Sequence, residues 1–476
     1  AASDVYKRQT VESALVFLRH CELHNFRSWD NLTLDLQPGI TVFVGANGQG
    51  KTNFLEGINY LATLGSHRVS GDSPLIQDGK DSAQLAATAV HNHRELTVAI
   101  EINSGKSNQA TINTAPCRSR EIVGILSTVL FAPEDLGLVR GEPAGRRAYM
   151  DTLLVQRRPR LRGVISDYDK IVRQRNALLK SASLSLRHGY HTAAGASALG
   201  TLDAWDAQLA HVGAQLLAAR LDFLHKIAPL VANNYVALAP HSRPVQLCYS
   251  SIPQLMVNDC ATTPPLDTDY LEAALLVGLA DKREREIDRG VTLAGPHRDD
   301  LTLLLGTQPA KGFASHGESW SLALALRLAA YDLLTSEGTE PILLLDDVFA
   351  ELDHFRRAAL ATVASKAEQT LITAAVGEDL PDELHVTATH TVSTAGEANQ
   401  RISLLDGVLT DDPSVNEPAP GGIAGRYNPG APDTVGFSNT GVPDMCGIDT
   451  SDTDSTGNMH DDRDEVNGET RKEDSK

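Results

Sequence analysis

The sequence predicts an α/β protein in which a helical insertion separates the two halves of one nucleotide-binding domain. Three observations support this fold class. A glycine-rich phosphate loop follows an apolar strand early in the chain and reads Gly45-Ala46-Asn47-Gly48-Gln49-Gly50-Lys51-Thr52. A second apolar strand, residues 341–345, ends far along the chain in the paired carboxylates Asp346 and Asp347. Between these two segments, Leu and Ala recur at helical spacing over long stretches.

The phosphate loop fits the pattern G-x-x-x-x-G-K-[ST] and has the neighbours that this pattern requires. The apolar, β-branched run at residues 40–44 predicts a buried parallel strand before the loop, and residues 52–61 have helical periodicity after it. Glycines let backbone N–H groups turn toward phosphates, and the helix N-terminus adds partial positive charge. We therefore expect the loop to bind a nucleoside triphosphate, with Lys51 on the β- and γ-phosphates and the Thr52 hydroxyl on Mg²⁺.

The two carboxylates at the end of the far strand complete this predicted site. Asp346 is expected to hold Mg²⁺ through water, and Asp347 is expected to position or deprotonate the attacking water. Lys51 and Asp347 are thus the candidate catalytic residues, and Thr52 with Asp346 the candidate metal ligands.

The first half of the nucleotide-binding domain, residues 14–132, is also expected to contain an antiparallel β layer. Residues 18–23 and 32–36 alternate between apolar and polar side chains and are typical of paired strands. Residues 83–113 alternate in the same way, with a turn at Asn103-Ser104-Gly105. We expect a mixed sheet with this antiparallel layer beside its parallel strands.

Residues 133–289 form the predicted helical insertion. Residues 202–224 and 270–285 show its Leu and Ala faces most clearly, and the absence of sustained heptads argues against a long coiled coil. Residues 140–180 hold 11 Lys or Arg and four acids. This stretch is either a surface for a phosphate backbone or a solvated helix face.

The second half of the nucleotide-binding domain, residues 290–406, contains Ser315-His316-Gly317 at the start of a helical segment. A Ser-x-Gly element at a helix N-terminus offers N–H groups and a hydroxyl to an anion, although an ordinary N-cap has the same composition. Residues 370–374 predict one more buried strand.

Charge is unevenly distributed along the chain, whose formal net charge is −19. Residues 407–476 hold 15 acidic and 5 basic residues, which leaves 46 acidic and 37 basic residues in the rest. This segment is rich in Gly, Pro, Asp, Ser and Thr, so we expect a disordered acidic tail.

The termini and the cysteines limit the interpretation further. Residues 1–13 are expected to be a non-native extension, because the first Met is Met150 and the segment DVYKRQ back-translates to a transposon end used in sequencing libraries. Five scattered cysteines argue against a disulfide framework or a zinc site. Without an apolar stretch of about 18 residues, we expect a cytoplasmic protein with no membrane segment.

With these motifs in this order, the chain resembles the SMC-like ABC-type ATPases and, within them, the RecF family. The resemblance extends over residues 16–406 and rests on several runs beyond the phosphate loop and the acidic strand. These runs are Asn25-Phe26-Arg27-Ser28, Asn53-Phe54-Leu55-Glu56, Phe131-Ala132-Pro133-Glu134-Asp135-Leu136, Gln174-Arg175-Asn176 and Gly295-Pro296-His297-Arg298-Asp299-Asp300.

The resemblance implies an ABC-type ATPase head with an inserted helical arm and a weak ATPase activity that acts as a switch. It implies a homodimer that forms on ATP, with the nucleotide held between the loop of one protomer and Ser315 with Gly317 of the other. Arg27 resembles the family's phosphate-contacting arginine. The implied partners are gapped duplex DNA with its single-/double-strand junctions, and RecO- and RecR-like mediators that help load the recombinase in replication, repair and the SOS response.

The chain departs from the family pattern at His316 and Glu318, which stand where glutamine is usual, and at Ala350, where serine is usual. A carboxylate at position 318 would repel a triphosphate unless it points away. The family's metal-contacting glutamine is not identified in this sequence. Two other interpretations remain open, a self-contained P-loop NTPase and an SMC-like nuclease component. The first lacks an Asn-Lys-x-Asp guanine motif, and the second has only one His and two Asp in residues 295–300.

Overall fold

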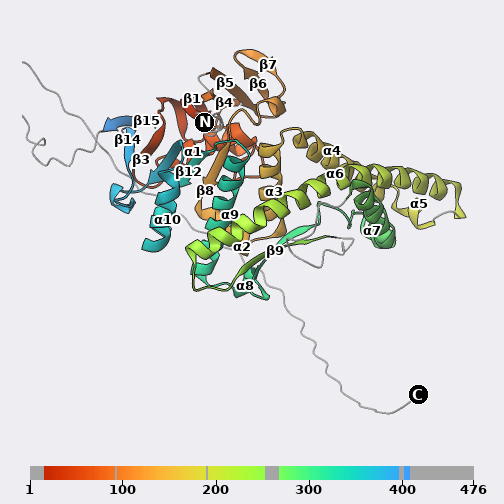
Figure 1. Cartoon of the computed structure of the whole chain (residues 1–476). Coiled ribbons are helices and arrows are strands. Elements are labelled where there is room, and N and C mark those ends of the chain that lie inside the picture. The colour runs from red at the N-terminus through yellow and green to blue at the C-terminus, as the bar shows by residue number, and fades with distance from the viewer. Residues whose placement is uncertain (1–15, 92–93, 189–190, 252–266, 396–400, 408–476) are drawn as a thin grey trace, which may run out of the picture. The chain divides into compact units, whose positions relative to one another are not determined.

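A computed structural model describes residues 16–91, 94–188, 191–251, 267–395 and 401–407. At its centre is a six-stranded sheet with the strand order β15-β14-β3-β13-β12-β8 (Figure 1). Five strands run parallel, and β15 pairs antiparallel with β14 at one edge. The strands are β3 (Gly39–Val44), β8 (Thr128–Phe131), β12 (Ile342–Asp346), β13 (Gln369–Ala374), β14 (Val386–Ala395) and β15 (Arg401–Gly407).

A second, fully antiparallel sheet has the order β2-β1-β4-β5-β6-β7. Each strand pairs with its neighbour in the register that the apolar alternation predicts, for example Leu23 opposite Leu32 and Leu85. The expected α/β class with parallel and antiparallel layers is therefore confirmed. The strands are β1 (Val16–Phe26), β2 (Trp29–Asp35), β4 (Ser82–His91), β5 (Arg94–Asn103), β6 (Gln109–Ile112) and β7 (Ala115–Cys117).

The two faces of the parallel sheet belong to two different hydrophobic cores. Side chains alternate along a strand, so in β12 Ile342 and Leu344 face one way while Leu343 and Leu345 face the other. The first pair packs in the core that contains α1 (Lys51–Thr63) and the antiparallel sheet. The second pair packs in the core that contains α9 (His316–Ser336) and much of the helical insertion. All five residues of β12 are buried, which explains its continuous apolar sequence.

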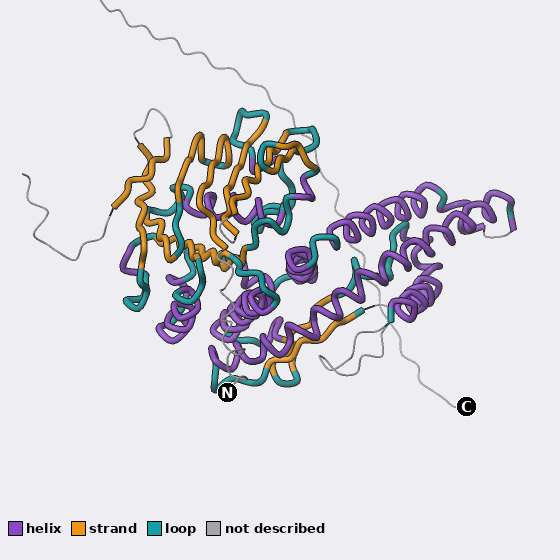
Figure 2. The backbone as a smooth tube through the Cα atoms, turned by 45° about the horizontal axis from the view of Figure 1, so that its top comes forward, coloured by secondary structure: helices purple, strands orange, loops and turns teal. Residues whose placement is uncertain are grey.

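The insertion between β8 and β10 is mainly helical, and its long helices α4, α6 and α7 run beside one another away from the sheets (Figures 1 and 2). The three-stranded sheet β11-β10-β9 lies near its base. The helices are α2 (Leu136–Arg140), α3 (Pro143–Arg157), α4 (Leu161–Ser181), α5 (Ser183–His188), α6 (Ala193–Leu238) and α7 (Thr268–Arg289). The remaining elements of this region and of the second half are β9 (Val245–Ser250), β10 (Asp300–Leu305), β11 (Gln308–Pro309), α8 (Ala310–Phe313) and α10 (His354–Ala364).

A buried charge network holds the long helices together. The Arg175 side chain on α4 is fully buried and donates to Asp206 on α6 at 2.6 Å and to Glu286 on α7 at 2.6 Å. Its Nη1 donates to the Thr292 hydroxyl at 3.0 Å. One guanidinium on α4 thus satisfies groups from α6 and from α7 with the segment that follows it, all far from Arg175 in the chain.

The run at residues 295–300 has a structural role that the sequence alone did not assign. Gly295 has a φ of +120°, and a Cβ at this position would lie 2.5 Å from the Tyr168 hydroxyl on α4. The same hydroxyl is 2.8 Å from His297 Nδ1, and the Asp300 carboxylate accepts two hydrogen bonds from Arg146 on α3. The run therefore fastens the start of β10 to the base of the insertion.

Several expectations need correction or stay untested. Residues 202–224 are only the middle of α6, which continues through Pro229 to 46 residues. Cys248 on β9 is disulfide-bonded, which the scattered cysteines did not indicate, whereas Cys21 and Cys117 are free. The tail after Gly407 and the extension at residues 1–13 also lie outside those ranges, and the domain boundaries stay a prediction. Among the described helices, none has both the length and the apolarity that a membrane span needs.

Candidate nucleotide-binding site

The phosphate loop lies between β3 and α1, as its flanking periodicity predicts. Gly48 and Gly50 have φ values of +85° and +93°, a region that side chains disfavour, and Gly50 is the N-cap of α1. Lys51 is buried, and its Nζ donates to the carbonyls of Gly45 at 2.5 Å and Ala46 at 3.0 Å. The ammonium therefore lies against the loop backbone, within reach of any phosphate that the loop would hold.

Asp346 and Thr52 meet at the carboxyl end of the parallel sheet. The Thr52 hydroxyl donates to Asp346 Oδ1 at 2.9 Å, and the Thr373 hydroxyl at the end of β13 donates to the same oxygen at 2.7 Å. Burial raises the pKa of the Asp346 carboxyl, and these two hydrogen bonds partly oppose the effect. A hydroxyl and a carboxylate oxygen side by side are donors of the kind that Mg²⁺ prefers.

Asp347 follows the last residue of β12, and its backbone is no longer in the extended conformation of the strand. Its φ of +53° is in the left-handed region, and its backbone N–H donates to the Thr373 hydroxyl at 3.0 Å. Burial lowers the pKa of Lys51, whereas the nearby charges of Asp347 and Asp346 raise it. The two carboxylates thus share one electrostatic environment with the loop lysine, but only Asp346 is fully buried.

Arg27 lies beside the loop helix, and its predicted phosphate contact stays a prediction. Its Nε and Nη2 donate to both oxygens of Glu56 at 2.9 and 2.7 Å, and its Nη1 donates to the Pro74 carbonyl at 3.0 Å. Glu56 on α1 is fully buried; burial raises its pKa, but the hydrogen bonds from Arg27 and Ser66 outweigh this and lower it. In this conformation the guanidinium of Arg27 is committed to Glu56 beside the loop helix.

Ser315 and Gly317 lie at the N-terminus of α9, where Ser315 is the N-cap. Its hydroxyl accepts from the Glu318 N–H at 3.2 Å, and the Glu318 carboxylate accepts from the Ser315 N–H at 2.9 Å. This reciprocal capping box takes the Glu318 carboxylate back over its own helix start. Arg243 and the Ser242 hydroxyl also donate to Glu318. The repulsion expected from position 318 is therefore compensated within the chain.

The Ser315 face is an open groove of ≈ 550 Å³ that contains no residue of the phosphate loop. Its lining comes from the end of α6, the start of α9 and the start of α10, and Phe355 on α10 is 54% exposed beside it. The Ser-x-Gly element and the phosphate loop are thus parts of two separate surfaces of the described chain.

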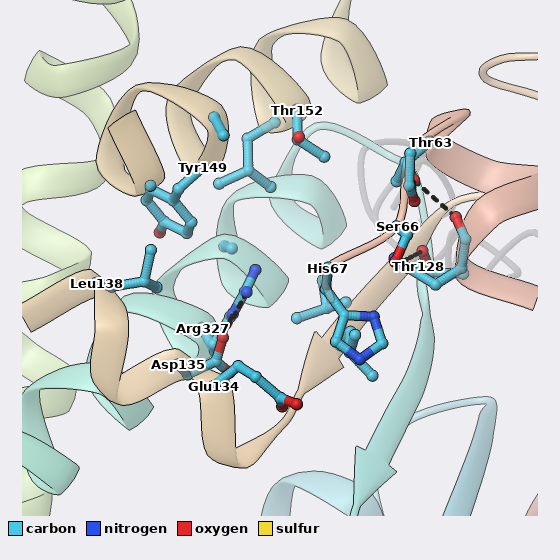
Figure 3. A pocket seen from close by; sticks show the side chains of 18 of the residues that line it. Thr63, Ser66, His67, Thr128, Glu134, Asp135, Leu138, Tyr149, Thr152 and Arg327 are labelled. Atoms are coloured by element: carbon cyan, nitrogen blue, oxygen red, sulfur yellow. Dashed lines mark hydrogen bonds and ion pairs between the residues drawn. The ribbon is translucent and has the colours of Figure 1, made fainter. Parts of the chain in front are cut away.

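A cavity of ≈ 520 Å³ lies between the end of α1, the turn after β8, and α3 and α9 (Figure 3). It also lacks phosphate-loop residues. Asp135 accepts from Arg327 on α9 at 2.6 Å, and its other oxygen accepts from the Ala132 N–H at 3.1 Å. The run at residues 131–136 therefore connects the end of β8 with the helix that carries Ser315, a role that its sequence did not reveal.

His67 and Glu134 extend into the same cavity from opposite sides (Figure 3). Both ring nitrogens of His67 are buried without a hydrogen-bond partner among the described residues. Burial lowers the pKa of His67, while the carboxylates of Glu134, Glu56 and Asp346 act in the opposite direction. Sequence reasoning missed this histidine because nothing in its local pattern separates it from a loop residue.

Most basic side chains of residues 140–180 form hydrogen bonds within the chain, although only Arg146 and Arg175 are buried. Seven of these side chains donate hydrogen bonds to other residues, among them Arg146, Arg157 and Arg175. The other four, Arg160, Lys170, Arg173 and Lys180, are exposed on or next to α4, and Arg140 is exposed as well. The surface available to a phosphate backbone is therefore smaller than the composition indicates.

The His and Asp side chains of residues 295–300, on which the nuclease interpretation rested, also contact other residues of the chain. His297 contacts Tyr168, Asp299 accepts from the Tyr249 hydroxyl at 2.9 Å, and Asp300 pairs with Arg146. Across the described residues, no group of three or more His, Cys, Asp or Glu side chains has the geometry of a metal site.

A match to a known protein family shows the class of protein to which the chain belongs. Residues 17–392 match the family model described as the RecF/RecN/SMC N-terminal domain. Together with the mixed sheet, the phosphate loop and the acidic strand end, this match makes the chain an ATPase head of the ABC/SMC type.

Individual proteins that match over most of the chain identify the family within this class. The chain is 54% identical over 406 residues to the DNA replication and repair protein RecF of Rhodococcus erythropolis, an alignment that covers 84% of this chain and 99% of that protein. Solved structures of the recombination mediator RecF of the RecFOR pathway share the fold at 22% identity. The RecF-ATP structure has a TM-score of 0.72 over 84% of this chain and 100% of its own. The RecF-ATPrS structure has a TM-score of 0.71 over 83% and 99%. The chain belongs to the RecF family, the ATP-binding ABC/SMC-type proteins of DNA replication and repair.

Proposed function

We propose that the chain is an ATP-driven switch that dimerises on ATP to clamp DNA. The observation that supports this most strongly is the division of the nucleotide contacts between two surfaces. Lys51, Thr52 and Asp346 form one half-site, and Ser315 with Gly317 lines a groove that contains none of them. A second copy of the chain can complete both sites at once, which is the geometry of an isologous dimer.

In this proposal the phosphate loop binds ATP, and Lys51 contacts the β- and γ-phosphates. Thr52 and Asp346 would hold Mg²⁺, which neutralises phosphate charge when it is bound. Asp347 positions the attacking water. Ser315 and Gly317 present a hydroxyl and N–H groups to the γ-phosphate held by the other copy. Hydrolysis removes that phosphate and its charge-assisted hydrogen bonds, so the dimer opens.

The proposed DNA partner follows from the relatives and not from a contact within this chain. The RecF-type relatives act in replication, repair and recombination mediation. We infer that the dimer binds gapped duplex DNA at single-/double-strand junctions in the cytoplasm. RecO- and RecR-like mediators would then help it load the recombinase during the SOS response. Slow hydrolysis suits this role, because the lifetime of the ATP-bound dimer sets how long the DNA is held.

A fluorescence-anisotropy titration with gapped duplex DNA tests this function. The wild-type chain is expected to bind more tightly with ATP and Mg²⁺ than with ADP. Lys51→Arg keeps the charge but changes its shape, so this variant should lose most of the ATP-dependent gain while its thermal unfolding stays unchanged. Equal DNA retention by the wild-type chain in ATP and ADP would contradict the switch.

A further inference from the structure

Arg356, in the first turn of α10, lies directly against Gly317. Its Nε donates to the buried Ser321 hydroxyl at 2.7 Å, and its Nη1 donates to Asp353, the N-cap of α10. A Cβ on Gly317 would lie 3.3 Å from the Arg356 Nη2, tighter than most such contacts. Two nitrogens of the guanidinium are thus fixed, and the third is directed to the glycine of the Ser-x-Gly element.

The third nitrogen has no hydrogen-bond partner among the described residues. The side chain of Arg356 is 18% exposed, and the open part belongs to the groove that Ser315 and Gly317 line. A guanidinium with two anchored nitrogens and one free nitrogen loses little rotamer entropy when it binds an anion. This arrangement is preorganised for a phosphate oxygen.

The charges around this position favour an anion. Glu318 is occupied by Arg243 and by the start of its own helix, and Asp353 is shared with Arg356 itself. The N–H groups at the start of α9 add the positive end of the helix dipole. No other carboxylate lines the groove.

We propose that Arg356 is a phosphate-contacting residue that acts across the dimer interface. Its Nη2 donates to the γ-phosphate of the nucleotide bound by the second copy's loop, beside the contacts from Ser315 and Gly317. A side chain at Gly317 would require the guanidinium to shift by a few tenths of an ångström. The assignment rests on the proposed function, since the phosphate it contacts belongs to another copy of the chain.

The test uses the full-length variant Arg356→Gln and the matched control Arg357→Gln. Arg357 is the next residue along α10, and its Nε donates to the Leu352 carbonyl away from the groove. Arg356→Gln should bind a fluorescent ATP analogue with unchanged affinity, because each copy's own loop is intact. Its ATP-dependent dimerisation and its ATP hydrolysis should both fall at least about tenfold, as expected for the loss of one charge-assisted hydrogen bond. Arg357→Gln should change neither.

Mixing two impaired variants separates action across the interface from a structural role. Lys51→Ala disables the loop, and Arg356→Gln disables the groove. In the mixed dimer, one site combines an intact loop with an intact Arg356, so the mixture should hydrolyse ATP faster than either variant alone. An Arg356 that acts only within its own chain gives no gain.

The possible failures have different meanings. If the wild-type chain dimerises on ATP and Arg356→Gln does so equally well, the assignment of Arg356 is wrong and the switch stands. A mixture without regained activity also overturns the assignment. If the wild-type chain stays monomeric with ATP and Mg²⁺, the proposed function fails and takes this assignment with it.

Discussion

The Thr52 hydroxyl donates a hydrogen bond of 2.9 Å to Asp346, although 294 residues separate the two in the chain. The contact forms because β3 and β12 flank β13 in one parallel sheet and end at the same edge. Loop and carboxylate therefore become neighbours only when the second half of the head folds onto the first. The helical insertion departs from the end of β8, which lies at the same edge of the sheet because β8 runs parallel to β12.

Replacing Asp347 with Asn should stop hydrolysis while ATP binding is retained. A general base contributes about 10²- to 10⁴-fold to rate, so kcat should fall by at least about 100-fold. The ATP-bound dimer should then persist for longer. Phosphate release and sedimentation, measured on the same samples, check both effects. Glu351→Gln, an exposed carboxylate on the next turn, is the control and should leave kcat unchanged.

Replacing Lys51 with Ala should weaken ATP binding without unfolding the chain. The lysine loses hydrogen bonds to charged phosphates that are each worth about 1.5–3 kcal/mol, so the Kd for ATP should rise by roughly 10- to 100-fold. Equilibrium titration with a fluorescent ATP analogue measures the change. An unchanged Kd would mean that the loop is not the nucleotide site.

The capping box at Ser315 gives the protein a pH-dependent stability. The backbone N–H of Ser315, together with Ser242 and Arg243, lowers the pKa of the Glu318 carboxyl from 4.5 to about 2, although burial opposes the shift. A folded pKa below the unfolded pKa means that the stabilisation is complete above the unfolded value and is lost as pH falls toward the folded value.

The stability difference between wild type and Glu318→Gln should therefore be constant above about pH 5 and shrink between about pH 4.5 and pH 2. Urea denaturation of both proteins at each pH gives this difference directly. If the difference does not change over that range, Glu318 is not ionised in the capping box.

Replacing Arg175 with Met should destabilise the helical insertion. The substitution removes the cation between Glu286 and Asp206, which are almost fully buried. Asp206 keeps its ion pair with Arg283, but the Glu286 carboxylate loses its ion-pair partner. Breaking a buried pair on one side costs about 3–5 kcal/mol. Chemical denaturation should show this loss, whereas Arg173→Met, an exposed change on the same helix, should stay within about 0.5 kcal/mol of wild type.

The sequence was most informative where a single local rule decides the structure. Continuous apolar runs predicted the buried strands β3, β12 and β13, and alternation predicted the antiparallel layer, because burial on one or two faces determines these patterns. The phosphate loop was predictable since its glycines, lysine and threonine are needed at fixed spacing. The match to the RecF family confirms the fold class that these patterns indicated.

Features that depend on tertiary contacts were not predictable. The count of basic residues in residues 140–180 indicated a basic surface, but partners far away in the chain, such as Glu286 for Arg175 and Asp300 for Arg146, neutralise four of the eleven. From the sequence, the Glu318 carboxylate was expected to repel a triphosphate, but in the structure it forms an ion pair with Arg243. The link between Asp135 and Arg327 and the approach of Arg356 to Gly317 also arise only when distant helices pack together.

Sedimentation velocity of the full chain with ATP and Mg²⁺, and then with ADP and Mg²⁺, is the decisive test of the ATP-dependent dimer. The division of the nucleotide site between two surfaces predicts a dimer with ATP and a monomer with ADP. Ser315→Arg, which fills the groove, should be monomeric with both nucleotides. A wild-type chain that is monomeric with ATP as well as ADP would contradict the account.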